Sequence, residues 1–92
     1  MTVVTDNPGK SRYELKIDGA EAFVDYTRQG RTLVLIHTEV PRALSGQGVG
    51  TRLARGVLDE ARREGWKVIA RCEFIAGFIS RNPDYQDLLA SG

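Results

Sequence analysis

The stretch from Pro41 to Ala54, PRALSGQGVGTRLA, decides the fold, because it joins an apolar strand pattern to a helical pattern. Gly46, Gly48 and Gly50 stand at alternate positions inside it. Glycine is unfavourable within a helix, but it tolerates close neighbours and positive φ angles better than other residues do. Glycines at a strand-to-helix junction therefore predict either an anion-binding loop or a turn that packs the helix closely against a sheet.

The residues before this stretch predict a three-stranded antiparallel meander. Apolar and polar residues alternate over 12–18, and the Asp-Gly pair at 18–19 suits a tight hairpin turn. A second strand is expected over 21–28, followed by a Gln-Gly turn. The run RTLVLIHTEV, residues 31–40, is rich in β-branched side chains and largely apolar on both faces, so it is expected inside the sheet.

The pattern changes to helical spacing after the glycines. Apolar residues at intervals of three and four predict a helix over 48–64, with Gly65 as its C-terminal stop. The run WKVIARC, residues 66–72, is expected as a short buried strand, and 74–80 as a second helix that ends before Pro83. The expected order is β-β-β-α-β-α, an α/β (α+β) fold in which a helix crosses between the third and fourth strands.

The length and composition are typical of one small globular domain. The chain has 92 residues, of which 41% are hydrophobic and 27% are charged. Residues 1–11 carry Asp, Asn, Pro and Gly in succession, so they are predicted to form a flexible leader. Residues 12–92 are predicted to form the single domain.

Charge and cysteine content restrict the expected partners and location. The 13 basic and 12 acidic residues give a net charge of +1, without the basic stripe typical of nucleic-acid or membrane binding. No apolar run approaches the roughly 20 residues that cross a bilayer, and the N-terminus lacks a signal-peptide pattern. A lone cysteine, Cys72, forms no internal disulfide, which predicts a cytoplasmic location. One histidine and one cysteine on separate elements predict no metal site.

The glycine loop does not match two common nucleotide motifs. The phosphate-binding loop of NTPases requires a lysine after its last glycine, and Thr51 follows Gly50 here. The dinucleotide fingerprint requires a glycine three positions further on, where Leu53 stands. A phosphate site of another kind and a packing turn both remain open at this point.

Residues 37–89 resemble the GCN5-related N-acetyltransferases. The resemblance rests on the strand end HTEV, the loop SGQGVG, the helix after it, and the cysteine-bearing strand followed by NPDYQDLL. The resemblance is closer to the short single-domain members of the family. These members carry H-T-E-V, then R-G-Q-G-[IV]-G, then a C-P-F…HPEY tail. The resemblance implies a mixed, mostly antiparallel sheet and acetyl transfer from acetyl-CoA to a primary amine. The helices that usually follow the family's first strand are missing, which implies a shallow, open acceptor cleft.

The resemblance also implies the residues that bind acetyl-CoA. The family motif [QR]-x-x-G-x-[GA] falls on Ser45, Gly48 and Gly50, and Ser45 departs from the usual arginine or glutamine. The backbone N–H groups of the loop and the Thr51 hydroxyl are expected to hold the diphosphate, and the strand end HTEV the pantetheine arm. The full set of expected cofactor residues is Glu39, Val40, Ser45, Gly46, Gln47, Gly48, Val49, Gly50, Thr51, Cys72, Asn82 and Tyr85. Arg52 and Arg55 either meet the ribose phosphate or form a solvated face.

Three residues are candidates for the chemistry. Acyl transfer to an amine needs a group that takes the amine proton and a proton for the departing thiolate. His37 and Glu39 are two apart on one strand, so they share a face and either is suited to take the amine proton. Cys72 is implied to face the same cleft, as a proton donor, a transient acyl acceptor or a partner in a mixed disulfide. A structural role remains the alternative for Cys72 and for His37.

Several departures from the family pattern favour a second function. Phe78 stands where related enzymes often have a tyrosine general acid, Asn82 replaces a histidine, and Glu73 replaces a proline. Tyr85 is retained and is implied to border the pantetheine channel. Together with Ser45 and the missing helices, Phe78 favours the alternative of a CoA-binding or interaction module that has lost turnover. A nucleotide-binding protein, a third alternative, would prefer ATP or NAD. The acceptor is expected to be a small molecule or a protein, and the chain to be a monomer or homodimer.

Overall fold

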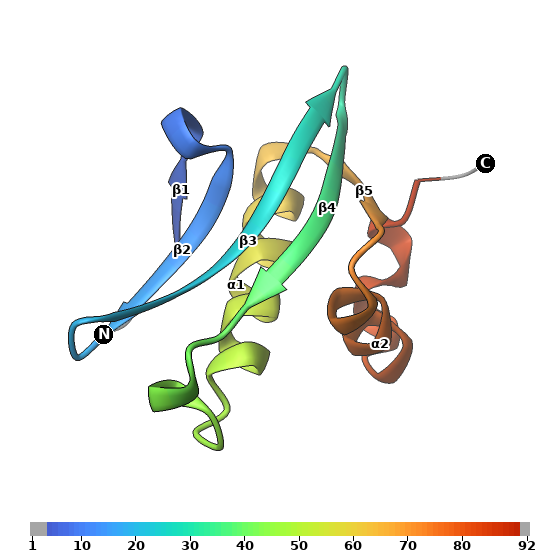
Figure 1. Cartoon of the computed structure of the whole chain (residues 1–92). Coiled ribbons are helices and arrows are strands. Elements are labelled where there is room, and N and C mark those ends of the chain that lie inside the picture. Colours follow the sequence, from blue (N-terminus) through green and yellow to red (C-terminus); the bar gives the residue numbers. More distant parts are fainter. Residues whose placement is uncertain (1–3, 91–92) are drawn as a thin grey trace.

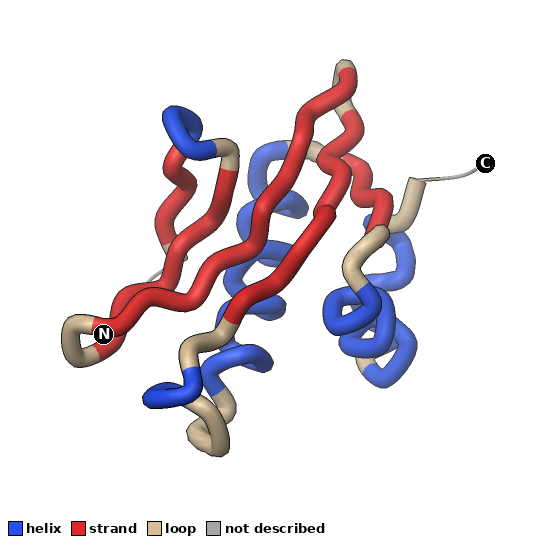
Figure 2. The backbone as a smooth tube through the Cα atoms, viewed as in Figure 1, coloured by secondary structure: helices blue, strands red, loops and turns tan. Residues whose placement is uncertain are grey.

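The strands form one five-stranded sheet whose order follows the chain, β1-β2-β3-β4-β5. The computed structural model describes residues 4–90. Its strands are β1 (Thr5–Asn7), β2 (Arg12–Ile17), β3 (Ala20–Gln29), β4 (Thr32–Glu39) and β5 (Lys67–Ala70). The helices are α1 (Val49–Glu64) and α2 (Glu73–Arg81), with short 3-10 helices at Pro8–Lys10, Arg42–Leu44 and Pro83–Leu88. Neighbouring strands are antiparallel except β4 and β5, which run parallel because α1 crosses between them (Figure 1, Figure 2).

The first strand corrects the expectation of a flexible leader over 1–11, and it adds one strand to the expected order. β1 pairs antiparallel with β2 along its whole length. The Tyr26 hydroxyl on β3 donates a hydrogen bond to the Asp6 carboxylate at 2.5 Å, and Arg28 forms an ion pair with the same carboxylate at 2.7 Å. Polar residues that suggest a turn are therefore held by partners about 20 residues later in the chain. Residues 1–3 lie outside the described part.

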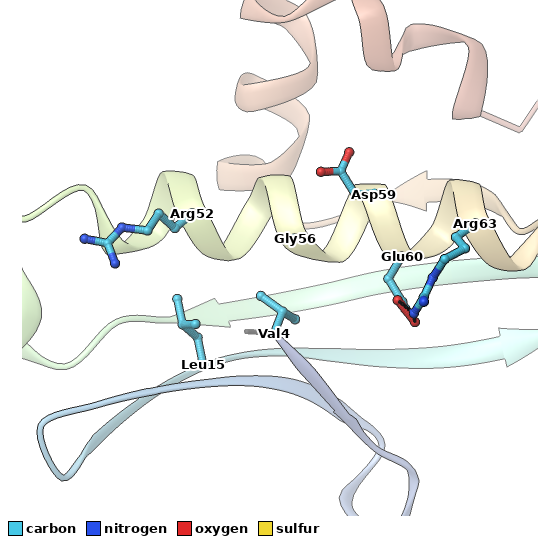
Figure 3. Close-up of a pocket in the computed structure, with 7 residues that line it drawn as sticks. All are labelled: Val4, Leu15, Arg52, Gly56, Asp59, Glu60 and Arg63. Carbon is cyan, nitrogen blue, oxygen red and sulfur yellow. Dashed lines mark hydrogen bonds and ion pairs between the residues drawn. The ribbon is translucent and has the colours of Figure 1, made fainter. Parts of the chain in front are cut away.

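The segment ahead of β1 also packs against α1. An added Cβ at Gly56, in the middle of α1, would overlap Val4, so only glycine lets the valine side chain rest on the helix backbone. Figure 3 shows Val4 and Leu15 directed at α1 close to Gly56, beside a surface hollow of about 320 Å³. Glu60 and Arg63 form an ion pair on the same side of the helix. Residues 4–11 are thus part of the domain.

Local sequence signals place the turn and the helix ends. Asp18 and Gly19 both have positive φ, 49° and 80°, as a two-residue hairpin turn of the predicted kind requires. The turn leads straight from β2 into β3, so no helix follows β2. Helix α1 has Gly48 as its N-cap and Gly65 as its C-cap, which confirms the predicted limits of 48–64 to within one residue. Helix α2 is one residue longer at each end than predicted.

The core lies between one face of the sheet and the two helices. Helix α1 crosses this face, and α2 packs beside it against β4 and β5 (Figure 1). The apolar stripe of α1 is buried as predicted, at Val49, Leu53, Val57, Leu58 and Ala61. The opposite face carries Phe23, Val34 and Ile69, and within residues 4–90 no helix covers it. No helix in that range is long and apolar enough to cross a bilayer.

Candidate functional site

The parallel pair of strands opens after four residues. β4 and β5 pair from Thr32 and Lys67 to Leu35 and Ala70, and there the ladder ends. The Leu35 carbonyl accepts hydrogen bonds from the backbone N–H of Arg71 at 2.9 Å and of Cys72 at 3.1 Å. β4 continues to Glu39 with β3 as its partner, while the chain after β5 turns into α2. The second half of β4 therefore borders an opening in the sheet.

A β-bulge at this point determines which way the next side chains point. Leu35 lies opposite Tyr26 and His37 lies opposite Asp25, so Ile36 is an extra residue on β4. Tyr26 is in the core and Asp25 points to the other face, and cross-strand partners project together. His37 therefore projects from the face away from α1, and Glu39, two residues later, does the same.

His37 and Glu39 form an exposed pair. The His37 Nε2 atom lies 2.6 Å from Glu39 Oε2, and the two side chains are 57% and 54% exposed. This agrees with the prediction that the two residues share a face. Because no helix covers that face within the described residues, the pair is open to an approaching molecule.

Cys72 is held on the other side of β4. Thr38 lies between His37 and Glu39 and points the opposite way, and its hydroxyl lies 3.0 Å from Cys72 Sγ. Cys72 is the N-cap residue of α2 and is 8% exposed. The three predicted catalytic residues thus border the same opening, but the thiol and the His37–Glu39 pair lie on different sides of the strand.

The glycine loop leaves the start of α1 open. Gly46 and Gly48 have φ angles of 80° and 70°, and a Cβ added at either would meet no atom within 4 Å. No side chain caps α1, and no acidic residue lies in its first turn. The first N–H groups of a helix lack internal partners and carry partial positive charge, so this helix start is suited to an anion.

A hollow of about 310 Å³ lies at this helix start. Its lining residues are Val40, Leu44, Ser45, Gly46, Gly48, Val49, Gly50, Thr51 and Phe74. The hydroxyl of Ser45 donates to the Arg42 carbonyl at 2.8 Å, and the Gln47 amide donates to the Ala43 carbonyl at 3.4 Å. These two side chains brace the loop from within. The hollow therefore has a polar end of backbone groups and an apolar end.

Gly50 differs from the other two loop glycines. Its φ is not positive, so its backbone conformation is open to any residue. An added Cβ would lie 2.7 Å from Cζ of Phe74, so an aromatic ring already fills the space that the sequence assigned to a phosphate. The sequence alone did not predict a role for Phe74. The available signal was Gly50 itself, a glycine within the predicted helix whose backbone conformation does not require glycine.

Asn82 and Tyr85 lie elsewhere. The Asn82 amide donates to the Phe78 carbonyl at 2.8 Å and so closes the end of α2. The Tyr85 hydroxyl donates to Asp59 at 2.7 Å, and burial together with this hydrogen bond raises the pKa of the phenol. Neither residue lines the hollow at the glycine loop, so the structure gives no support to the expected place of Tyr85 beside the cofactor.

The two arginines early in α1 have different surroundings. The Arg55 guanidinium lies over the rings of Phe78 and Tyr85, 5.5 and 5.9 Å from their centroids, and donates to the Tyr85 hydroxyl at 3.4 Å. Its role is therefore to join α1 to the C-terminal segment. Arg52 lies on the other side of α1, beside the hollow near Val4 (Figure 3). Within residues 4–90 no three His, Cys, Asp or Glu side chains gather as metal ligands would.

Comparisons with known proteins identify the family. A family model described as GCN5-related N-acetyl-transferase matches residues 12–88. The NATD1 proteins of mouse and human are each 31% identical to this chain over 77 residues, which cover 80% of it and 70% and 68% of their own lengths. The solution structure of a GCN5-like protein from Staphylococcus aureus matches with a TM-score of 0.73 at 27% identity, covering 97% of this chain and 88% of that one. The predicted mixed, mostly antiparallel fold is confirmed by this match. The chain belongs to the GCN5-related N-acetyltransferase family.

Proposed function

We propose that the protein is an N-acetyltransferase that moves an acetyl group from acetyl-CoA to a primary amine. Membership of the family supports acetyl transfer in general. The observation that carries the proposal is the uncapped start of α1, which opens into a hollow next to the opening between β4 and β5. An anion site and a gap in a sheet lie side by side, as a diphosphate joined to an extended arm would require.

The donor groups of the hollow fit the cosubstrate. Backbone N–H groups from Gly46 to Thr51 are suited to the diphosphate, because Gly46 and Gly48 present no side chain to obstruct it. The expected N–H of Ser45 is not available, since it donates to the Arg42 carbonyl at 3.1 Å. Val40 and Phe74 provide an apolar end for an uncharged arm. Beyond Leu35, β4 has a partner on one side only, so its other edge is available for strand-like hydrogen bonds to amide groups of the arm. Pro41 has no N–H and ends this edge.

The residues around the opening divide the chemistry between them. When bound, acetyl-CoA supplies an acyl group activated as a thioester. Glu39, with His37 beside it, takes the proton from the attacking amine on the open face of the sheet. The N–H of Val40, the residue after β4, donates to the thioester oxygen. Cys72, held by Thr38, provides a proton for the departing thiolate.

The uncovered face of the sheet affects which acceptor amines can reach the site. Because the His37–Glu39 pair is exposed and no helix lies over it in the described chain, the acceptor amine need not fit an enclosed pocket. An exposed lysine, a protein N-terminus and a small amine all meet this condition. The protein would act as a monomer or homodimer in the cytoplasm.

Two observations favour an alternative function within the same family. Phe78 is 2% exposed, lies in the core and has no proton to donate, and Cys72 is largely buried. A CoA-binding module without turnover would keep the glycine loop and tolerate both features. It predicts binding of CoA without consumption of the thioester.

Calorimetric titration with acetyl-CoA, ATP and NAD tests the cofactor. We expect saturable binding of acetyl-CoA that is at least about tenfold tighter than that of ATP or NAD and is weakened at least about tenfold by Gly48→Glu. Gly30→Glu is the matched control, because Gly30 also has a positive φ and open space around its Cα. Release of free CoA thiol in the presence of a panel of amines then separates the two functions. No binding at millimolar acetyl-CoA would exclude both.

A further inference from the structure

Phe74 is the large apolar residue of α2 that is not buried. Its neighbours on the helix, Ile75, Phe78 and Ile79, are at most 2% exposed, whereas Phe74 is 39% exposed. Its ring lines the hollow at the glycine loop. One exposed aromatic residue is common on protein surfaces, so its exposure alone indicates little.

Gly50 supplies an independent observation. It lies in the first turn of α1 with an ordinary backbone conformation, where alanine would be more favourable. Its missing side chain leaves room for the Phe74 ring, since an added Cβ would lie 2.7 Å from the ring's Cζ. The ring is therefore seated against the start of α1 by a position on another helix.

Phe74 belongs to an element that reaches both parts of the proposed site. Its ring shares the hollow with the backbone N–H groups at the start of α1. Cys72, two residues before Phe74 and the N-cap residue of the same helix, borders the opening of the sheet. Val40, at the end of β4, shares the hollow with Phe74. An apolar surface thus joins the anion site to the opening.

We propose that Phe74, seated by Gly50, is a specificity-determining residue that packs against the uncharged arm between the diphosphate and the thioester. This inference rests on the proposed function, because it assumes that the loop binds a diphosphate with such an arm. It assigns Gly50 an indirect role, which is to position the ring. A diphosphate that lacks the arm gains nothing from Phe74.

A double-mutant cycle measured by calorimetry tests the coupling of the two residues. The proteins are wild type, Gly50→Ala, Phe74→Ala and the double variant, and the ligands are CoA and ADP, which carries the diphosphate without the arm. We expect Phe74→Ala to weaken CoA binding about tenfold and to leave ADP binding unchanged. Gly50→Ala should weaken CoA binding in the presence of Phe74 and have no further effect in its absence, because no ring is then displaced.

Controls separate this inference from folding and from the proposed function. Leu89→Ala removes a comparably exposed apolar side chain away from the loop and should change neither affinity. Phe74→Leu, which retains an apolar surface, should bind CoA more tightly than Phe74→Ala, and thermal unfolding checks that each variant is folded. Equal effects of Gly50→Ala in both backgrounds, or unchanged CoA binding by Phe74→Ala, would overturn the inference while the proposed function stands. Absence of CoA binding by the wild type would overturn both.

Discussion

The hydroxyl of Thr38 lies 3.0 Å from Cys72 Sγ, and this contact joins the end of β4 to the N-cap residue of α2 across the opening of the sheet. No other side-chain hydrogen bond among the described residues links these two elements. We expect Thr38→Val, which keeps the shape and removes the hydroxyl, to lower the free energy of unfolding by up to about 1 kcal/mol. Thr38→Ser retains the hydroxyl and should retain most of that stability. Urea denaturation of the three proteins measures the effect, and equal midpoints would show that the contact contributes nothing.

The packing of Val4 on Gly56 predicts that replacing this helix glycine by alanine lowers the free energy of unfolding, which is the opposite of the usual effect. Glycine to alanine inside a helix normally stabilises by up to about 1 kcal/mol. At Gly56 the new methyl group overlaps Val4, so we expect destabilisation by about 1–3 kcal/mol.

The same substitution in a Val4→Ala background should be much less harmful, because the overlapping side chain is gone. Gly77→Ala in α2 is the matched control, because its Cβ would meet only the movable end of Arg81 at 3.3 Å. Chemical denaturation of the single and double variants provides the comparison. Stabilisation by Gly56→Ala in the wild-type background would mean that Val4 does not occupy this site.

The lowered pKa of Glu14 predicts how the free energy of unfolding depends on pH. Its hydrogen bond with Arg12 at 2.8 Å, aided by a second one from Asn7 at 3.0 Å, lowers the pKa of this carboxyl. A carboxyl with a lowered pKa in the folded state stabilises the fold above the unfolded value of about 4.3, and that stability is lost as the pH falls through the folded value. Wild type should therefore exceed Glu14→Gln in free energy of unfolding at pH 7, and the difference should shrink by pH 3. A difference that stays constant between the two pH values would contradict this assignment.

Glu39 is expected to affect turnover without affecting cofactor binding. Removing its charge with Glu39→Gln takes away the proposed proton acceptor, so kcat/KM for an amine should fall by about a hundredfold or more. The dissociation constant of acetyl-CoA should stay within about twofold, since it reports only binding. Asp25→Asn, which changes the residue opposite His37, is the control and should retain activity. Full activity of Glu39→Gln would contradict the role of Glu39 and leave His37 or water to take the proton from the amine.

Those parts of the fold that depend on neighbouring residues were predictable from the sequence. The Asp18–Gly19 turn needs two positive φ angles, and the pair of residue types reveals this locally. The limits of α1 follow in the same way from the glycines on either side. β1 was not predictable, because Asp6 is a turn-forming residue type whose partners, Tyr26 and Arg28, come much later in the chain.

In the candidate site, too, the features set by neighbouring residues were predictable from the sequence, and those set by residues distant in the chain were not. The glycine loop was predictable from residue types and their spacing, and His37 and Glu39 from the period of a strand. The role of Gly50 was not, since its neighbour Phe74 belongs to another helix. The position of Tyr85 was inferred from resemblance alone, and its hydrogen bond to Asp59 depends on how the last segment packs on α1.

The Leu35 carbonyl has a consequence for the energetics of binding. A carbonyl oxygen has two lone pairs, and here both are engaged, by the N–H groups of Arg71 and Cys72. The ladder between β4 and β5 ends at this shared carbonyl, because the chain after Ala70 turns into α2 and leaves the rest of the β4 edge unpaired on that side. A molecule that enters the gap need not separate paired strands, so the site is preorganised and little conformational free energy is lost on binding.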